Sequence, residues 1–545
     1  MYVDTSTLKR NGKTYTRHLL RISYRENGKV RKKTLLNISD RPEEEVEAIK
    51  LALKNKKKLT TLVSIDEIET TAGKSIAAVW TAKVIAERLG IKDALGDSQE
   101  AKAALLQVIA RLVDQGSRLS AVRFATRHAV CEILGIEKLN EHDLYRNLRW
   151  LAEEQERIEQ ELFRRRFADS PPTLFLYDVT SSYFEGNQNE LAKWGYNRDK
   201  KRGKKQIVLG LLTGPDGLPV AVRVFAGNAN DTQTVADQVQ ILASKFGVQN
   251  VTLVGDRGML KGPQIEDLPE GFRYITAISK PQIQKLLSCG TLQYELFSDK
   301  VCEVDADGLR FILRRNPVRA EEMAANRADK ESSIIKLAGK ETAYLQAHPR
   351  ASADTAKQRV AAKIKRLKVE KWLTVCESER TLEITRDEQA LEEAALLDGC
   401  YVIKSDLPKE DADAQTLHDR YCDLEMVERT FRTMKTTHLD LRPIFVRKAE
   451  NTRGHALVVM LSLLVQRELE RCWKELNVTV QEGLDELSAI NMLEVRLRDA
   501  VINDIPKPTE LGAELLKNAD VVMPEILPSR KASVSTTKTL QSERI

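Results

Sequence analysis

Two aspartates each stand where a short apolar run meets polar residues. Asp178 closes the run 174–178, and Asp256 directly follows the run 251–255. Because functional sites of α/β sheets lie at the carboxyl ends of strands, we expect both carboxylates at one edge of a sheet. Glycines on either side of Asp256–Arg257 allow a sharp turn and a close approach to a ligand. A single strand-end Asp is more often a cap or turn former, but two equivalent ones favour a shared site.

A third carboxylate, Glu428, is spaced seven residues from both Tyr421 and Lys435. Seven residues are almost two helical turns, so the three side chains share one helix face with a drift of about 20° per step. Lys435 could then reach a phosphate beside a carboxylate-bound metal. The alternative is an ordinary exposed face, which spacing alone favours. The buried stripe of such a helix would consist of Met426, Val427, Phe431 and Met434.

Three carboxylates from two strands and a helix suit hard divalent cations. Mg²⁺ takes oxygen ligands and usually keeps waters and substrate phosphate oxygens in its shell. Two such ions about 3.5–4 Å apart can activate a nucleophilic oxygen and stabilise the leaving oxygen of a phosphodiester. This chemistry requires no nucleophilic side chain.

The sequence resembles the DDE transposases of bacterial insertion sequences, in the group marked by Tyr-x2-Arg-x3-Glu-x6-Lys. The resemblance rests on LYDVTSSYFEG around Asp178, VGDRGM around Asp256, and the Tyr421–Glu428–Lys435 spacing. LLTGPDGLPV, the turn at 227–231 and DGCYVIKSD at 398–406 are also similar, so the likeness covers roughly 173–280 and 398–470.

The resemblance implies a ribonuclease-H-like core that binds two Mg²⁺ ions, with Mn²⁺ able to substitute. Asp178 would lie on its first strand, Asp256 after its fourth, and Glu428 on the helix after its fifth, as catalytic and metal-binding residues. A β-rich insertion would separate the second Asp from the Glu, and the long segment between Asp256 and Glu428 has room for it. One position departs from the family pattern, since Leu424 stands where the family has an Arg. The role of that missing Arg could fall to Arg420, Arg429 or Arg432.

The apolar pattern predicts a multidomain α/β protein with a mixed sheet flanked by helices. Strands are expected at 174–178, 206–212, 218–225, 251–255, 273–278 and 400–404, with a helix at 232–246. Asn27–Gly28 predicts a hairpin in the N-terminal region. The expected regions are a basic β-hairpin region (1–60), a helical DNA-binding or oligomerisation region (61–170), the first core part (171–282), a β-rich and long-helix insertion (283–398), the second core part (399–470), a C-terminal helical region (471–527) and a disordered tail (528–545).

Positive charge is concentrated near the N-terminus. The first sixty residues hold sixteen Lys and Arg against seven Asp and Glu, a net of +9, whereas the whole chain carries +6. Such blocks often face nucleic acid, although a solvated face is the plainer interpretation. A second basic stretch is predicted to bind DNA, with Trp194 and Tyr196 just before it for stacking on bases. It comprises Arg198, Lys200, Lys201, Arg202, Lys204 and Lys205.

Several protein classes are excluded by composition. The longest near-apolar run is 456–465. That run is shorter than the roughly 20 residues that a membrane helix needs. Seven scattered Cys argue against a disulfide framework and a Cys-based zinc site. Ile68 occupies the first glycine position of a P-loop ending at 73–75, so no ATP is expected. We expect a cytoplasmic, nucleoid-associated bacterial protein without membrane contact.

The predicted function is DNA transposition: binding of terminal inverted repeats, metal-dependent cleavage, and strand transfer into target DNA by a homodimer on DNA. Two alternatives stay open at this point. One is a metal-dependent nuclease of the same fold without strand transfer. The other is a repressor derived from a transposase, against which the presence of all three carboxylates argues.

Overall fold

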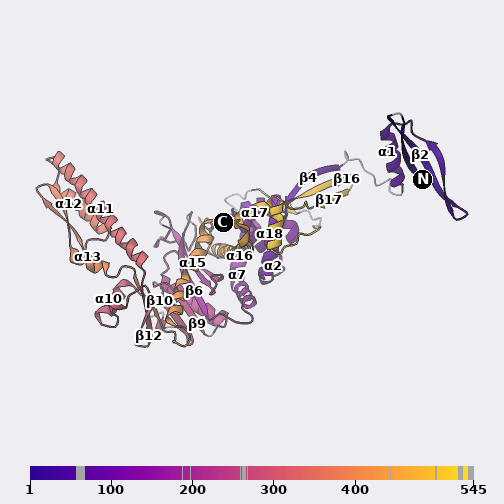
Figure 1. The fold of residues 1–545 in the computed structure, drawn as a ribbon. Helices are drawn as coiled ribbons and strands as arrows, with labels where there is room; N and C mark the ends of the chain where they lie inside the picture. Colours follow the sequence, from indigo (N-terminus) through magenta and orange to yellow (C-terminus); the bar gives the residue numbers. More distant parts are fainter. Residues whose placement is uncertain are drawn as a thin grey trace. The chain divides into compact units, whose positions relative to one another are not determined.

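The computed structural model describes all residues except 11, 57–67, 187, 197, 200, 249, 258, 261–264, 267, 438, 442–443, 498–499, 526–531 and 538–545. The described residues form two compact units. The smaller unit comprises 1–73 and 493–504, and the larger comprises 74–492 and 505–545. Figure 1 labels many of their helices and strands.

The smaller unit begins with a three-stranded antiparallel sheet. β2 (Lys13–Glu26) pairs with β1 (Tyr2–Arg10) on one side and with β3 (Lys29–Asn37) on the other. Asn27 and Gly28 both have positive φ, at 49° and 78°. A two-residue hairpin turn requires such values at both positions, so the predicted hairpin is confirmed. Strand β1 and helix α1 (Glu43–Lys54) were not predicted.

A second small sheet joins distant parts of the chain. Its order is β17–β16–β4, with β4 at Ile68–Ser75, β16 at Asn491–Leu497 and β17 at Ala500–Asp504. The prediction that 471–527 is helical is therefore wrong for these two C-terminal strands. Their partner β4 lies far away in the sequence, so local periodicity carries no record of the pairing.

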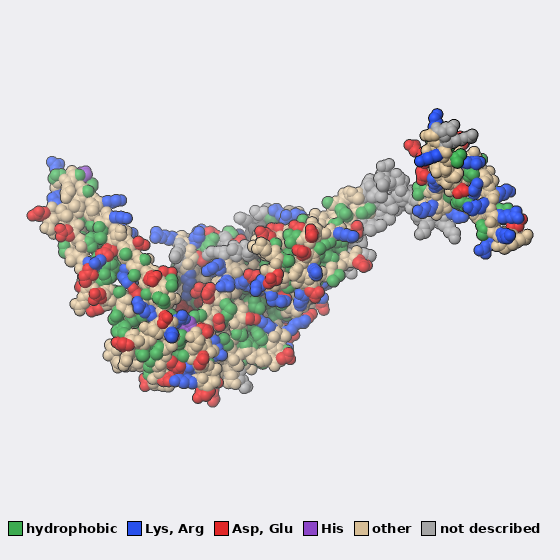
Figure 2. Space-filling view, viewed as in Figure 1, with side chains coloured by type: hydrophobic (Ala, Val, Ile, Leu, Met, Phe, Trp, Pro, Cys, Tyr) green, Lys and Arg blue, Asp and Glu red, His purple; other side chains and the backbone are tan. Residues whose placement is uncertain are grey.

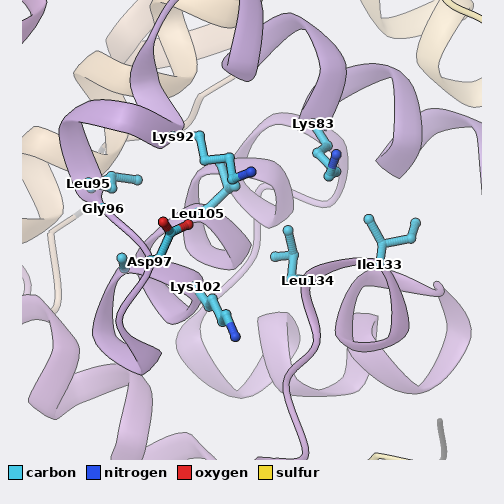
Figure 3. Close-up of a pocket in the computed structure, with 10 residues that line it drawn as sticks. Lys83, Lys92, Leu95, Gly96, Asp97, Lys102, Leu105, Ile133 and Leu134 are labelled. Atoms are coloured by element: carbon cyan, nitrogen blue, oxygen red, sulfur yellow. The ribbon is translucent and has the colours of Figure 1, made fainter. Parts of the chain in front are cut away.

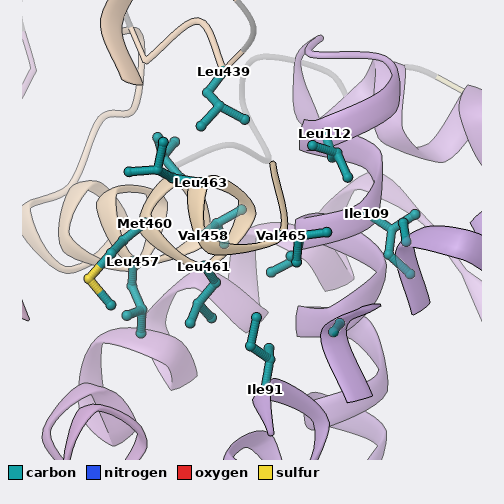
Figure 4. Close-up of a cluster of buried hydrophobic side chains, with 14 of the residues drawn as sticks. Ile91, Ile109, Leu112, Leu439, Leu457, Val458, Met460, Leu461, Leu463 and Val465 are labelled. Atoms are coloured by element: carbon teal, nitrogen blue, oxygen red, sulfur yellow. The ribbon is translucent and has the colours of Figure 1, made fainter. Parts of the chain in front are cut away.

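The larger unit contains a helical layer around one buried helix, α16 (Ala449–Cys472). Residues 456–461 of α16 are at most 1 % exposed, and α16 packs against α4 and α7. Figure 4 shows Leu457, Val458 and Leu461 of this helix among the core side chains. The surrounding elements are α2 (Ala77–Arg88), α3 (Ile91–Leu95), α4 (Gln99–Val113), α5 (Arg118–Arg127), α6 (Val130–Leu134), β5 (Lys138–Leu139), α7 (Glu141–Arg166), η6 (Lys474–Leu476), α17 (Val480–Ser488) and α18 (Glu510–Asn518).

Two predictions for this helical layer can be compared with the structure: the predicted helix is present, and the predicted disordered tail is in part wrong. The helix predicted from Leu144, Leu148 and Leu151 is α7, and all three side chains are buried. The predicted disordered tail is wrong at Ser533–Val534, because these residues form β18 and pair in parallel with β5. Residues 528–531 and 538–545 of that prediction lie outside the described residues. Within the described chain, no helix is both long and apolar enough to cross a membrane.

An eight-stranded mixed sheet forms the centre of the larger unit, in the order β11–β12–β15–β10–β9–β6–β7–β8. β6 is parallel to β9, and β9 to β10, whereas the other neighbours are antiparallel. The strands are β6 (Leu174–Tyr183), β7 (Gln206–Thr213), β8 (Pro219–Ala226), β9 (Val251–Gly255), β10 (Phe272–Ala277), β11 (Cys302–Ala306), β12 (Leu309–Arg315) and β15 (Cys400–Ser405). The expected mixed sheet and its six predicted strands are confirmed.

Helices cover both faces of this sheet, and alternate side chains of β6 enter two different cores. Leu174 and Leu176 join the core that includes α16, whereas Phe175 and Tyr177 join the core beneath α8. The covering elements are α8 (Asp231–Gln240), η3 (Ile241–Lys245), α10 (Lys280–Ser288), η4 (Tyr294–Leu296), α14 (Ala414–Cys422), α15 (Leu424–Arg432) and η5 (Thr433–Thr437). Asp178 has the parity of Leu176 and so faces the α16 side.

The predicted insertion needs a correction at its start. β11 and β12 lie within 283–398, yet they extend the central sheet through pairing of β12 with β15. The part that stands apart has its own small core around Ile334, Val360 and Trp372. It consists of α11 (Pro317–Ala347), α12 (Ala353–Arg366), β13 (Leu373–Ser378), β14 (Thr381–Arg386) and α13 (Glu388–Ala395).

Candidate active site

Asp178 and Asp256 occupy equivalent positions on two neighbouring parallel strands. Tyr177 of β6 pairs with Gly255 of β9, so the next residue on each strand is an Asp. Asp178 does not end its strand as predicted, because β6 continues to Tyr183 along β7. Only β9 ends here. The register nevertheless brings both carboxylates to one edge of the parallel pair.

Glu428 comes from α15, which packs directly on β6. Val427 and Phe431 are buried beneath the helix, as the predicted apolar stripe requires. The Thr430 hydroxyl donates to the carbonyl of Gly217 at 3.3 Å, in the β7–β8 turn. Gly217 has φ +72°, and a Cβ there would lie 2.8 Å from Met426 Cβ, so the turn and the helix are in close contact. These contacts hold Glu428 over the aspartate strands.

The three carboxylates line one open cavity of about 380 Å³. Burial raises the pKa of the Asp178 carboxyl to about 7, and the charges of Asp256 and Glu428 add to the rise. The Val179 N–H and Arg198 oppose it. The lining residues are Asp178, Val179, Thr180, Arg198, Asp199, Asp256, Glu428, Phe431, Arg432 and Lys435.

A pH-dependent stability follows from the raised pKa of Asp178. A carboxyl whose folded-state pKa lies above its ordinary value stabilises the fold fully below the ordinary pKa of about 3.9. This contribution is lost as pH rises through the folded pKa of about 7. In EDTA at pH 8, Asp178→Asn should therefore be more stable than the wild type, by on the order of 1–2 kcal/mol after allowance for partial exposure. Urea unfolding should show the difference shrinking towards pH 4. A less stable variant at pH 8 would contradict this.

The site suits a divalent cation in the chemistry of its donors. Asp178 and Asp256 each accept the next residue's backbone N–H at 2.7 Å, which fixes both carboxylates near the strand edge. Burial is the main cause of the raised Asp178 pKa, and the repulsion from Asp256 and Glu428 that adds to it is of the kind that a bound cation relieves. As the side chains stand, no three His, Cys, Asp or Glu residues in the described part of the chain form a ready chelating group. Binding would thus need the three carboxylates to turn towards one another within the cavity.

Lys435 lies in the same cavity but is already fully engaged. Its side chain is 9 % exposed and forms an ion pair with Asp199 at 3.2 Å. Its ammonium also donates to Thr180 Oγ1 at 2.6 Å and to the carbonyl of Ser181. Asp199 accepts a further hydrogen bond from the Tyr183 N–H at 3.1 Å. Lys435 therefore ties the β6–β7 loop to β6, a role that the sequence did not predict.

Tyr421 contacts Asp256, whereas Leu424, which stands at the family's Arg position, packs against the core. The Tyr421 hydroxyl makes a long contact of 3.5 Å to Asp256 Oδ1. Burial, followed by the Asp256 charge, raises the Tyr421 pKa, so this phenol stays protonated. Leu424 packs against the core, and Arg429 pairs with Glu425 at 3.2 Å on the surface. Of the three candidate arginines, Arg432 is the one that lines the cavity.

The helix that carries these residues is not one regular helix. α14 ends at Cys422, α15 spans 424–432, and η5 continues as a π-helical turn that includes Lys435. Glu428 and Lys435 nevertheless both line the cavity and Tyr421 reaches Asp256, so the predicted common face brings all three to the site.

The predicted basic stretch divides into residues near the cavity and residues in solvent. Arg198 lines the cavity, and its backbone N–H donates to Ser181 Oγ at 2.9 Å. Lys204 pairs with Glu185 at 2.6 Å, and the Lys201 ammonium lies 5.8 Å from the centre of the Tyr183 ring. Arg202 is exposed, Lys205 is half-buried, and Lys200 lies outside the described residues.

Another hollow in the helical layer has different chemistry. It measures about 170 Å³ and is lined by Leu95, Leu105 and Leu134 together with lysines, as Figure 3 shows. Two of these lysines, Lys83 and Lys92, are paired with Glu87 at 2.8 and 3.1 Å. The lining also includes Lys102 and one carboxylate, Asp97. A single carboxylate does not provide the donor set of the other cavity, so the three-carboxylate cavity is the candidate active site.

Asp199 and Thr180 are site residues that sequence reasoning missed. Asp199 interrupts the basic stretch, and an isolated acid among six cations could have indicated an internal ion pair. Thr180 has the parity of Asp178 on β6, so an alternating strand pattern placed it on the same face.

Comparison with known proteins identifies the class. Residues 169–465, more than half of the chain, match the family described as Transposase DDE domain, so the chain belongs to the DDE transposases. Its mixed-sheet core is accordingly the ribonuclease-H-like fold that the sequence predicted. Residues 3–64 match the model described as IS1634 family transposase, N-terminal domain, so this part of the chain is similar to the N-terminal domain of those transposases. Members of the DDE class typically use a divalent metal.

Two other comparisons add little. No curated protein matches the sequence. A solved structure, the cryo-EM structure of piggyBac transposase synaptic complex with hairpin DNA, aligns with a TM-score of 0.36 and 9 % identity, over 77 % of this chain and 70 % of that chain. A similarity this low supports no inference about the present chain.

Proposed function

We propose that this transposase cleaves the ends of its insertion sequence and joins them to target DNA, using two Mg²⁺ ions at Asp178, Asp256 and Glu428. The observation that carries the proposal is the meeting of these three carboxylates around one cavity, at register-matched positions of β6 and β9 and on α15. This cavity lies within the DDE domain of the chain. The protein would act in the bacterial cytoplasm, on nucleoid DNA.

The reaction consists of two displacements at phosphorus. In the first, a water oxygen bonds to the phosphorus at the element's end, the bond to the 3′ oxygen breaks, and a 3′-hydroxyl and a 5′-phosphate result. In the second, that 3′-hydroxyl loses its proton and attacks a target phosphodiester, and the displaced 3′ oxygen takes up a proton and becomes a new 3′-hydroxyl. Bound Mg²⁺ would supply charge stabilisation at the phosphate and activation of the attacking oxygen.

The side chains of this chain would divide the remaining work. Asp178, Asp256 and Glu428 would hold the ions, with Asp178 losing its proton as they bind. Tyr421 would brace Asp256 through its hydroxyl. Arg198 and Arg432, both on the cavity wall, would pair with phosphate oxygens and keep the scissile bond in line.

A strand-transfer assay with end-labelled DNA tests the proposal against its main rival. A transposase yields joined products that contain labelled end and target, whereas a nuclease of the same fold yields only cleaved ends. A repressor yields neither, although it binds the ends. The DNA that flanks the reading frame gives an independent check, because imperfect inverted repeats bordered by short direct repeats are expected there.

The N-terminal sheet is proposed to bind the terminal inverted repeats. Figure 2 shows Lys and Arg side chains (blue) spread over the visible face of this unit. Its strands carry exposed cations at Lys9, Lys13, Arg17, Arg25, Lys29, Arg31, Lys32 and Lys33. A homodimer would hold two such ends together in the DNA complex.

Deletion of residues 1–60 should weaken binding to end DNA and flatten its salt dependence. Each phosphate contact contributes about 0.9 to the slope of log affinity against log salt, so loss of several contacts lowers that slope by several units. Binding of full-length and shortened proteins, measured over a salt series, checks this. An unchanged slope would leave the sheet with a structural role only.

Arg432→Ala should slow end cleavage by about tenfold to a hundredfold, because a misplaced phosphate costs much in rate. Arg429→Ala is the matched control, since Arg429 lies on the same helix but pairs with Glu425 on the surface. Cleavage rates of the two variants at saturating DNA decide the point. Equal rates would show that the enzyme works without the family's Arg contact.

A further inference from the structure

Two aromatic side chains next to the active site face solvent. Trp194 is 63 % exposed and Tyr196 is 85 % exposed, the latter being the most exposed aromatic residue in the described chain. They are two residues apart in a short segment that starts at Lys193, which pairs with Gln206 at the start of β7. This segment therefore presents two exposed rings within three residues.

The backbone beneath this aromatic pair is firmly held. Lys193 and Gln206 exchange both backbone hydrogen bonds, at 3.1 and 2.9 Å. The buried Gln206 side chain donates to the carbonyls of Tyr196 and Gly227 at 3.0 and 2.8 Å. A Cβ on Gly195 would lie 2.0 Å from the Gly227 oxygen, so only glycine allows this approach. Because the segment is ordered before any ligand arrives, binding to its rings costs little conformational entropy.

The aromatic pair adjoins positive charge and the carboxylate cavity. Arg198, two residues beyond Tyr196, lines that cavity. Two residues span at most about 7 Å, the length of two nucleotide steps along one strand of B-DNA. Lys201 and Arg202 follow in the same loop. A DNA strand with a phosphate at the cavity would thus have its neighbouring bases within reach of both rings.

We propose that Trp194 and Tyr196 form a stacking platform for unpaired DNA bases beside the scissile phosphate. The inference rests on the proposed function and adds that the DNA strand bound beside the active site is unpaired. Every base has a π-face, so stacking on aromatic rings tolerates any sequence, and the flanking cations attract the backbone. Bases inside an intact duplex already stack on each other, so the platform selects unpaired strands at the element's end.

Equilibrium binding of full-length variants to two probes tests the platform. The probes are an oligothymidylate of about twelve nucleotides and a blunt duplex of random sequence. Trp194→Ala with Tyr196→Ala should lower single-strand affinity by about tenfold or more, since each stacked base contributes about 1–3 kcal/mol, and leave duplex affinity within about twofold. Trp194→Phe with Tyr196→Phe keeps both rings and should retain most single-strand affinity. Tyr344→Ala, which removes a half-exposed ring from α11, should change neither.

A separate variant tests whether the position of the two rings matters, and not only their presence. Gly195→Ala leaves both rings but displaces them, so it too should weaken single-strand binding selectively. An oligonucleotide with 5-iodouracil should crosslink to Trp194 or Tyr196 on irradiation, as peptide mapping would show. Equal loss on both probes, or no loss on the single strand, would overturn the platform even where strand transfer proceeds. A protein that binds both probes as proposed here but joins no ends would instead refute the proposed function.

Discussion

Asp178→Asn, Asp256→Asn and Glu428→Gln are each expected to slow cleavage of the element's ends by about a thousandfold or more, while end binding stays nearly unchanged. Each amide removes one of three anionic oxygen donors around the cavity. Metal-dependent charge stabilisation accounts for several kcal/mol of such a barrier. Binding depends on phosphate contacts elsewhere, so it should survive. Single-turnover cleavage and a gel-shift titration of the same proteins measure the two effects.

Glu425→Gln supplies the matched control for this prediction. Glu425 lies one turn before Glu428 on α15, is exposed, and pairs with Arg429 rather than lining the cavity. It should cleave at close to the wild-type rate. Thermal unfolding measures metal binding independently of cleavage, because a ligand that binds only the folded state raises Tm. Mg²⁺ or Mn²⁺ should raise the Tm of the wild type and of Glu425→Gln, but less for the three triad variants. Near-normal cleavage by any triad variant would remove that residue from the site.

The sequence was most informative where its signals were local. Short apolar runs marked the strand that carries Asp178 and the strand that Asp256 follows, and Asn27–Gly28 marked a hairpin whose two positive φ angles are present. The pairing of Tyr177 with Gly255 could not be read from these patterns, because register depends on residues far apart in the chain. The resemblance to DDE transposases supplied what the patterns lacked, namely that Asp178, Asp256 and Glu428 belong to one catalytic site.

Long-range contacts account for the errors. β11 and β12 looked like the start of an insertion, yet β12 pairs with β15, which lies far later in the chain, and so extends the central sheet. β16 and β17 lie in a helical stretch and form a sheet with β4, near the other end of the sequence. A strand at a sheet edge needs only a partner, and its own sequence does not identify that partner.

The position of Lys435 shows the same limit within the active site. Seven-residue spacing correctly placed Glu428 and Lys435 on the cavity wall, but it could not show what the ammonium contacts. An ammonium has three donors, and here Asp199, Thr180 and Ser181 accept from it. A phosphate contact of the kind predicted from the sequence would displace one of these bonds. The structure thus favours Lys435 as the residue that fastens the β6–β7 loop.

Lys435→Ala is expected to destabilise the protein by about 3–5 kcal/mol and to reduce cleavage severely, because it breaks a buried ion pair by removing one of its charges. The other charge belongs to Asp199, whose side chain is 4 % exposed. Asp199→Asn should have much the same effect, since it breaks the same ion pair from the other side. If both act through one ion pair, the double variant will be no worse than either single variant. Lys204→Ala breaks the more exposed pair with Glu185 and should cost less than about 1 kcal/mol.

Denaturant unfolding and cleavage rates of these four variants separate the two roles of Lys435. A lysine that fastens the loop gives parallel losses of stability and rate in Lys435→Ala and Asp199→Asn, with strong non-additivity in the double variant. A lysine that contacts phosphate gives a slow Lys435→Ala of normal stability, beside an Asp199→Asn that cleaves normally. Lys435→Arg sharpens the choice, because a planar fork fits poorly among three acceptors arranged for a compact ammonium yet can still pair with a phosphate. Low stability in that variant would therefore assign Lys435 to the loop, and through it to the placement of Arg198 at the cavity.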